Sequence, residues 1–184
     1  EKLYKRARSL ENSGFKDEAE QIYNQIFMDF PSNERYYNAL KKILIKNQDC
    51  ISLIKNVDIF CEANKNSDYS KIKKLEILLT CNANWEDLFN PLIKKNQRNL
   101  KISKIIISLL INHNQEAIAI QTINEIRELN QKQTFFSNEL AYYYLSLRKY
   151  SESLKEFLNH IEENPKNFKI VKSRIMNFPN ESEL

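Results

Sequence analysis

The residues that could carry catalytic or metal chemistry are few and scattered along this 184-residue chain. It contains two histidines, His113 and His160, and three cysteines, Cys50, Cys61 and Cys81. A protein metal site needs Cys and His ligands at short, recurrent spacings, and these five residues have none of them. A phosphate-binding loop needs several glycines, and the chain contains one. We therefore expect a non-catalytic protein with no catalytic, cofactor-binding or metal site.

The same five residues fit structural roles. His160 falls at a helix packing position and His113 at a turn. Cys50 and Cys61 would lie three helical turns apart, too far to bridge each other. Because an odd number of cysteines without close spacing is not a disulfide framework, we expect all three cysteines to be small packing residues.

Composition narrows the fold class. The content of 42% hydrophobic and 28% charged residues is typical of a globular protein, and one glycine with four prolines favours helices joined by short connections. The net charge of +4 permits an acidic partner but does not by itself indicate nucleic acid. The longest apolar stretch, residues 105–111, is far shorter than the roughly 20 residues of a membrane span, so we expect no membrane insertion. The chain opens at Glu1 inside a helical pattern, and we expect it to be part of a longer protein.

Two segments near the ends of the chain share one helical pattern. In residues 1–31, small and apolar residues at helical spacing indicate two helices, separated at Gly14 and ended by Pro31. Residues 140–165 repeat the design and end at Pro165. The positions that define the pattern are Leu3, Ala7, Leu10, Ala19, Tyr23 and Ile26 in the first segment, and Leu140, Ala141, Tyr144, Tyr150, Ser153, Phe157 and His160 in the second.

The turn between the two helices recurs along the whole chain. Its residues, separated by 34, 35, 31 and 34 positions, are Gly14, Gln48, Ala83, Asn114 and Arg148. Core positions follow the same period: Leu40, Leu44, Leu53, Val57 and Phe60 in the second unit, Ile72, Leu75 and Leu79 in the third, and Ile106, Leu110, Ala119, Ile123 and Ile126 in the fourth. A period near 34 residues is typical of paired-helix repeats.

These segments resemble the tetratricopeptide repeat (TPR). In that family a small residue in the first helix packs against one in the second, an aromatic residue follows four positions later, and a proline ends the unit. The residues in those roles are Ala7, Ala19, Tyr23 and Pro31 in the first unit, and Ala141, Ser153, Phe157 and Pro165 in the last. The resemblance covers nearly the whole chain and is strongest at its ends.

The resemblance implies an all-α fold: a right-handed superhelical solenoid of about five antiparallel helix hairpins plus a C-terminal capping helix. We expect one TPR-like domain over residues 1–184, with repeats at 1–32, 33–66, 67–99, 100–132 and 133–166. The capping helix at 167–178 would present Phe168, Val171 and Ile175 on one face. The second helix of the third repeat carries Pro91, which would cost roughly 3 kcal/mol in a helix interior, so we expect that helix to start late or to kink.

In TPR-like stacks the first helices of the repeats line a concave groove. The groove-facing candidates are basic in the first four repeats and aromatic or apolar in the fifth: Arg8, Arg35, Asn38, Lys42, Lys46, Lys73, Lys101 and Lys104, then Phe135, Asn138, Tyr142 and Leu145. The alternatives are a solvated face for the lysines and burial against the capping helix for Phe135 and Tyr142. Some TPR proteins grip a C-terminal carboxylate with Lys, Asn and Arg at set positions. Those positions hold Tyr4, Arg8, Ala39, Ser70 and Lys74 here, so we do not expect that binding mode.

The function indicated is a protein-interaction scaffold whose groove binds a segment of another protein, acidic and with an apolar anchor. The alternative is an RNA-binding helical-repeat module, since hairpin repeats of similar length also read RNA. The weak net charge and the irregular repeat spacing count against RNA. The salt dependence of binding separates the two, because phosphate contacts give a steep slope.

Overall fold

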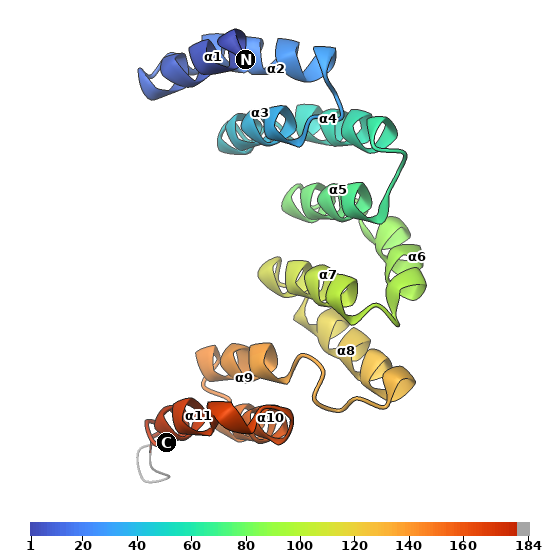
Figure 1. Ribbon diagram of the computed structural model, residues 1–184, viewed down its shortest axis with the longest axis vertical. Coiled ribbons are helices and arrows are strands. Elements are labelled where there is room, and N and C mark those ends of the chain that lie inside the picture. The colour runs from blue at the N-terminus through green and yellow to red at the C-terminus, as the bar shows by residue number, and fades with distance from the viewer. Residues whose placement is uncertain (180–184) are drawn as a thin grey trace. The chain divides into compact units, whose positions relative to one another are not determined.

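Eleven α-helices and one short 3-10 helix follow one another along residues 1–179, the part of the chain that the computed structural model describes (Figure 1). No strand occurs in this part, and the all-α prediction is confirmed. The elements are α1 (Lys2–Asn12), α2 (Lys16–Asp29), α3 (Glu34–Lys46), α4 (Cys50–Ala63), α5 (Asp68–Thr80), α6 (Glu86–Asn96), α7 (Leu100–Asn112), α8 (Glu116–Asn130), α9 (Ser137–Ser146), α10 (Tyr150–Glu163), η1 (Pro165–Asn167) and α11 (Phe168–Ile175). Two helices lie in each predicted repeat range, and α11 lies in the range predicted for the capping helix.

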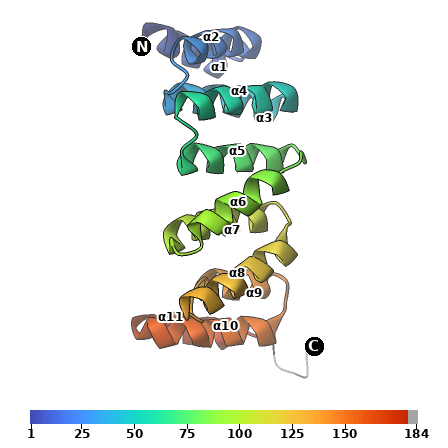
Figure 2. The same ribbon diagram turned by 90° about the vertical axis from the view of Figure 1, so that its right-hand side faces the viewer.

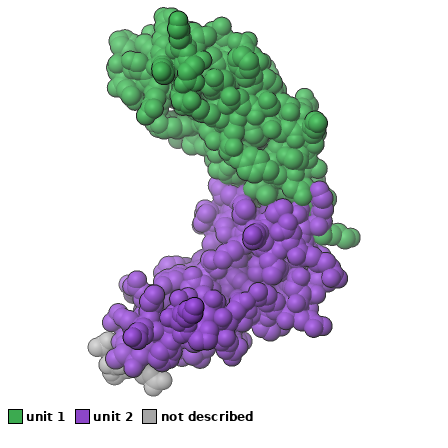
Figure 3. All heavy atoms as spheres, viewed as in Figure 1, with its two compact units in different colours: residues 1–94 green, residues 95–184 purple. Residues whose placement is uncertain are grey.

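The chain forms two compact units, residues 1–94 and residues 95–184 (Figure 3). In the first unit α1 packs on α2, α2 on α3, α3 on α4, and α4 on α5. In the second unit α7 packs on α8, α9 on α10, and α10 on α11. In Figure 2 the members of the packed pairs α3/α4 and α10/α11 overlap one another. The boundary between the units falls inside α6, shortly after Pro91.

A residue with left-handed backbone follows each of the helices α1, α3, α5, α7 and α9. The values of φ are +88° at Gly14, +55° at Gln48, +48° at Asn82, +59° at Asn114 and +58° at Arg148. Two backbone hydrogen bonds close each turn in the same way. In the first turn, the Phe15 N–H donates to the Leu10 carbonyl at 2.9 Å and the Gly14 N–H to the Glu11 carbonyl at 3.2 Å. This is the Schellman motif, which satisfies carbonyls at a helix end.

The predicted turn residue is confirmed in four of these five turns, and it is wrong by one position in the third. There the left-handed residue is Asn82 and not Ala83. The left-handed conformation brings Cβ close to the carbonyl oxygen and costs roughly 1–2 kcal/mol for most residues. Asparagine tolerates it better than alanine, because its short polar side chain can form local hydrogen bonds.

Helix α6 is irregular, as predicted for the helix that contains Pro91. Helix α6 begins four residues after its left-handed residue, whereas α2, α4, α8 and α10 each begin two residues after theirs. Pro91 remains inside α6. The Trp85 carbonyl, directly before the helix, accepts hydrogen bonds from the N–H groups of Leu88 and Phe89 at 3.1 and 2.9 Å. The late start therefore shortens α6 without excluding the proline.

Small residues lie where the paired helices approach most closely. Ala7, Ala19, Ala141 and Ser153 are fully buried, and the Ser153 hydroxyl donates to the Ala141 carbonyl at 2.9 Å. Most other predicted core positions are buried as well. Six are half-buried: Leu10, Ile72, Tyr144, Tyr150, His160 and Ile175. Two are exposed, Leu3 and Phe168, which lie in the first turn of the terminal helices α1 and α11. Within α11 the buried residue is Val171.

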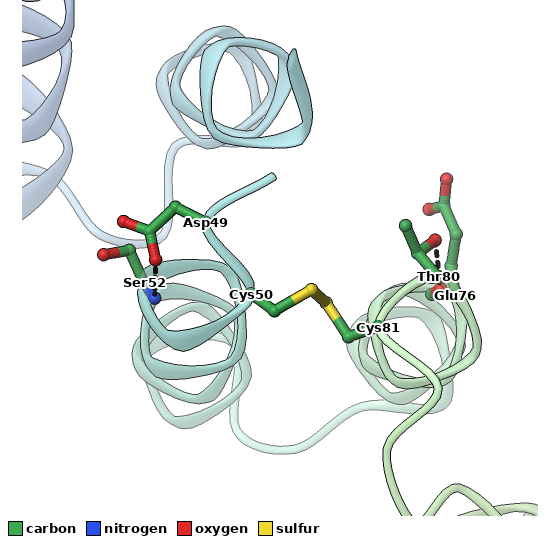
Figure 4. The surroundings of a disulfide bond; sticks show 6 residues. All are labelled: Asp49, Cys50, Ser52, Glu76, Thr80 and Cys81. Atoms are coloured by element: carbon green, nitrogen blue, oxygen red, sulfur yellow. Dashed lines mark hydrogen bonds between the residues drawn. A yellow bond between two sulfur atoms is a disulfide. The ribbon is translucent and has the colours of Figure 1, made fainter. Parts of the chain in front are cut away.

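The prediction for the cysteines was wrong for two of the three, because Cys50 and Cys81 form a disulfide (Figure 4). Their Cα atoms are 5.6 Å apart, at the first residue of α4 and directly after the last residue of α5. The bond spans 31 residues, so only the packing of α4 on α5 brings the two sulfur atoms together. Cys61 is a free, buried thiol that donates to the Ser70 carbonyl at 3.2 Å. Burial raises the pKa of this thiol.

The turn geometry predicts that introducing glycine at one turn raises the free energy of unfolding, and that removing glycine from the equivalent turn lowers it. Arg148→Gly should raise the free energy of unfolding of the second unit by about 0.5–1 kcal/mol, because glycine adopts positive φ without a Cβ clash. Gly14→Ala should lower the stability of the first unit by about 1–2 kcal/mol, although open space surrounds the added Cβ. Urea unfolding followed by circular dichroism measures both. Arg148→Ala is the control and should change little; a gain equal to that of Arg148→Gly would show that backbone conformation is not the cause.

The disulfide predicts a redox-dependent stability of the first unit. Closing a 31-residue loop restricts the unfolded chain, and the loop-closure relation gives about 3–4 kcal/mol of stabilisation. The double variant Cys50→Ser/Cys81→Ser should lose this amount in urea unfolding under oxidising conditions. A reductant should lower the midpoint of the natural chain and leave the variant unchanged. An unchanged midpoint in both proteins, with the bond verified by thiol titration, would contradict the prediction.

Candidate partner-binding surface

Ion pairs join the first helices of neighbouring pairs in the first unit. Lys42 and Lys46 on α3 approach Glu11 on α1, with Nζ–Oε1 distances of 3.0 and 3.9 Å. Arg35 Nη1 lies 3.4 Å from Glu1 Oε1, and its guanidinium stacks 4.1 Å from the centre of the Tyr4 ring. The hydrogen bond from Lys42 is the main cause of a lowered pKa at Glu11.

A second set of contacts joins α3 to α5 around Glu34. This carboxylate accepts hydrogen bonds from the Tyr69 hydroxyl and, at 3.4 Å, from the Asn38 amide. Lys73 Nζ lies 3.0 Å from Glu34 Oε1 and 4.8 Å from the centre of the Tyr69 ring. The hydrogen bonds from Tyr69 and then Lys73 lower the pKa of Glu34.

The predicted basic stripe of the first unit is therefore largely neutralised by its own carboxylates. Arg35 pairs with Glu1, directly before α1, and Lys42, Lys46 and Lys73 each have an acidic partner on a neighbouring first helix. Arg8 is exposed and forms no ion pair within residues 1–179. A broad pocket of about 690 Å³ between α1 and α3 contains three of the predicted residues; its lining is Tyr4, Asn33, Glu34, Arg35, Asn38, Ala39 and Lys42.

The second unit carries a groove between its first helices α7 and α9, formed by two pockets that share lining residues. The first pocket, about 310 Å³, is lined by Leu100, Lys101, Lys104, Lys132, Thr134, Phe135, Phe136, Ser137, Asn138, Glu139, His160, Glu163 and Asn164. The second, about 350 Å³, is lined by Ser108, Ile111, Asn112, Phe136, Asn138, Glu139 and Tyr142. Phe136, Asn138 and Glu139 border both pockets, so the two are adjacent, and together we call them the α7/α9 groove.

Phe136 forms part of the groove wall in a strained conformation. Its φ of +65° is unusual for a bulky residue, and non-glycine residues in this region persist only where surrounding contacts hold them. Arg127 on α8 supplies those contacts on both sides. Its Nε donates to the Phe135 carbonyl at 2.9 Å, and its Nη2 donates to Ser137 Oγ at 3.1 Å. The wall is thus fixed by hydrogen bonds from beneath.

Arg127 is itself held by Glu156 on α10. The two side chains form a bidentate pair with N–O distances of 3.0 and 2.7 Å, and they are only 7% and 9% exposed. Planar bidentate geometry is the strongest form of this interaction. The pair connects α8, α10 and the segment that precedes α9, so it positions the groove wall.

The predicted residues of the second unit divide between groove and core. Lys101, Lys104, Phe135, Asn138 and Tyr142 all border the α7/α9 groove. Phe135 is 6% exposed, so it offers little surface to a ligand, whereas Tyr142 is 39% exposed and packs edge-on against Phe157 at 5.3 Å. Leu145 is half-buried and packs against the cluster of Ala141, Phe157 and Val171 instead of facing the groove.

Sequence reasoning missed Arg127, Glu156, Phe136 and Ile111. Arg127 follows Ile123 by four residues and therefore lies on the apolar stripe of α8, where a charge signals a buried partner. That signal was present in the sequence. The identity of the partner was not, since Glu156 lies 29 residues away on another helix.

Within residues 1–179, no group of three or more His, Cys, Asp or Glu residues is placed to hold a metal ion. No helix in this part is long and apolar enough to cross a membrane. No protein-family model matches the chain, and a search of curated proteins finds no significant relative.

The buried pair predicts a marked asymmetry between single and double substitutions. Arg127→Met should destabilise the second unit by about 3–5 kcal/mol, because it leaves the Glu156 carboxylate buried without its partner. Arg127→Met/Glu156→Leu should be more stable than the single variant, because no buried charge remains. Urea unfolding of the three proteins measures this difference. A double variant less stable than Arg127→Met would show that Glu156 has another partner.

Proposed function

We propose that this chain is a non-catalytic protein-interaction scaffold of the TPR-like type. It binds an extended segment of a partner protein in the α7/α9 groove. The proposal includes the finer architecture: five antiparallel helix hairpins and a C-terminal capping helix in a right-handed solenoid. It is supported by five turns of the same hydrogen-bonded type at nearly regular intervals, and by the contact of small residues between paired helices.

The observation that carries the proposal is the rigid wall of the α7/α9 groove. A binding site must be held in shape by residues whose conformations are locked by packing and hydrogen bonds. The strained Phe136 and the buried Arg127–Glu156 pair beneath it meet this condition. A preorganised surface loses less conformational entropy when a partner binds, which favours affinity.

The charge pattern favours a protein partner over RNA. Five of the seven basic candidate residues, Arg35, Lys42, Lys46, Lys73 and Lys104, pair with carboxylates of the chain itself. Phosphate binding would have to break these pairs and would leave Glu11, Glu34 and Glu139 beside the phosphates. The apolar side chains of Ile111 and Tyr142 instead favour an apolar anchor from a protein segment.

The test is selection of random displayed dodecapeptides on the immobilised 184-residue chain, followed by measurement of binding rates. Ser108→Trp should abolish binding, because Ser108 lines the apolar pocket and the indole would fill it. Tyr142→Ala should speed dissociation at least fivefold with little salt dependence, because an apolar anchor acts through desolvation. Tyr143→Ala, the neighbouring tyrosine outside the pocket lining, is the matched control.

Circular dichroism of each variant verifies the fold, and Ser108→Trp keeps the test decisive if Tyr142→Ala disturbs the Phe157 contact. Peptides that bind Ser108→Trp as tightly as the natural chain would refute the groove as the binding site. Single-stranded RNA that binds the chain with a steep salt slope, in competition with the peptides, would favour the RNA-binding alternative.

A further inference from the structure

The first end of the α7/α9 groove contains one cation that the protein does not neutralise. Three lysines line this end: Lys101, Lys104 and Lys132. Lys104 forms an ion pair with Glu139 and lies over the Phe136 ring. Lys132 pairs with Glu163 at 2.6 Å.

Lys101 is exposed and has no ion pair within residues 1–179. Both carboxylates that line this end, Glu139 and Glu163, are already engaged by the other two lysines. His160 contacts the amide of Asn167 through Nε2 at 2.9 Å. The charge available to a ligand at this end is therefore that of the Lys101 ammonium.

The second end of the groove is suited to an apolar side chain. Ile111 and Tyr142 provide apolar surface there, and the other lining residues are the buried Phe136 and Ser108, Asn112, Asn138 and Glu139. The only ionised group among them is Glu139, which Lys104 neutralises. An apolar group entering this pocket therefore displaces water without burying an unpaired charge.

The distance between the two ends follows from helix geometry. Lys101 and Ile111 are ten positions apart on α7, and a rise of 1.5 Å per residue places their Cα atoms about 15 Å apart. An extended chain advances about 3.3–3.6 Å per residue, so this distance corresponds to four or five residues. Asn138 borders both pockets between these ends, and its side-chain amide forms no hydrogen bond within the described part of the chain. Its donor and acceptor are free for a segment passing along the groove.

We propose that the α7/α9 groove recognises a segment with a fixed order and length. A carboxylate binds at Lys101, an apolar side chain lies between Ile111 and Tyr142, and the two ligand residues are four or five positions apart in an extended chain. This inference rests on the proposed function and specifies its partner. It also assigns different roles to two lysines: Lys101 binds the ligand carboxylate, whereas Lys104 pairs with Glu139 and packs over Phe136 in the groove wall.

The test uses the displayed dodecapeptides selected on the intact chain. Selected peptides should carry Asp or Glu four or five positions from Leu, Ile, Phe or Met, in one consistent order. Lys101→Gln should weaken the best peptide about threefold to fivefold, as expected for one exposed charge pair, and the effect should fade at high salt. Lys149→Gln removes an exposed charge outside the groove and is the matched control; it should leave binding unchanged.

A charge reversal gives the sharper result. Selection on Lys101→Glu should enrich Lys or Arg at the same separation from the apolar residue, a change that a merely structural role of Lys101 would not produce. Peptides that are blocked by Ser108→Trp but show no acidic position, or no change on Lys101→Glu, would overturn this inference and leave the proposed function standing. Peptides that Ser108→Trp does not block, or a selection that yields no binding peptide, would overturn both.

Discussion

Only three residues connect α1 to α2, α3 to α4, α7 to α8 and α9 to α10, and the shortness of these connections is a constraint that underlies the rest of the structure. A reversal so short requires one residue in the left-handed region, and the chain meets the requirement with a single glycine and otherwise with Gln, Asn and Arg. The Schellman hydrogen bonds then satisfy the last carbonyls of the first helix and set where the second helix begins. The two helices of a pair thereby meet in a defined register, in which small residues such as Ala141 and Ser153 face each other. Where the turn lengthens after α5, the next helix starts late and contains Pro91.

The α7/α9 groove depends on a different kind of contact. Its wall contains Phe136 in a conformation that a bulky residue adopts only under restraint, and the restraint is a buried guanidinium–carboxylate pair. Desolvating both charges offsets much of their attraction, so the pair adds little to net stability. Arg127 donates hydrogen bonds to Phe135 and Ser137, and these bonds fix the residues on both sides of Phe136. The Arg127–Glu156 pair is thus best understood as a positioning element for the groove.

Ion pairs between neighbouring helices reduce the positive charge that the predicted groove residues offer to a ligand. A net charge of +4 and a series of lysines suggest a basic groove, yet most of these cations face a carboxylate one helix away. Exposed pairs of this kind contribute little stability, and salt screens them. Among the basic candidate residues, Lys101 in the second unit and Arg8 in the first have no ion pair within residues 1–179. In the proposed function, specificity would depend on these few charges and on their distances from apolar surface.

The amino-acid sequence by itself determined the helices, most of their turns and most of the core. These features depend on local physics: helical periodicity, the conformational preference of Gly14 and the ends imposed by proline. Even Arg127 could be identified from its place on the apolar stripe of α8. The tertiary structure alone decided which distant residues meet. The Cys50–Cys81 bond, the Arg127–Glu156 pair and the partners of the lysines each join different helices. Their formation depends on how helices pack in space, and side chains separated by about thirty residues carry no local signal of that packing.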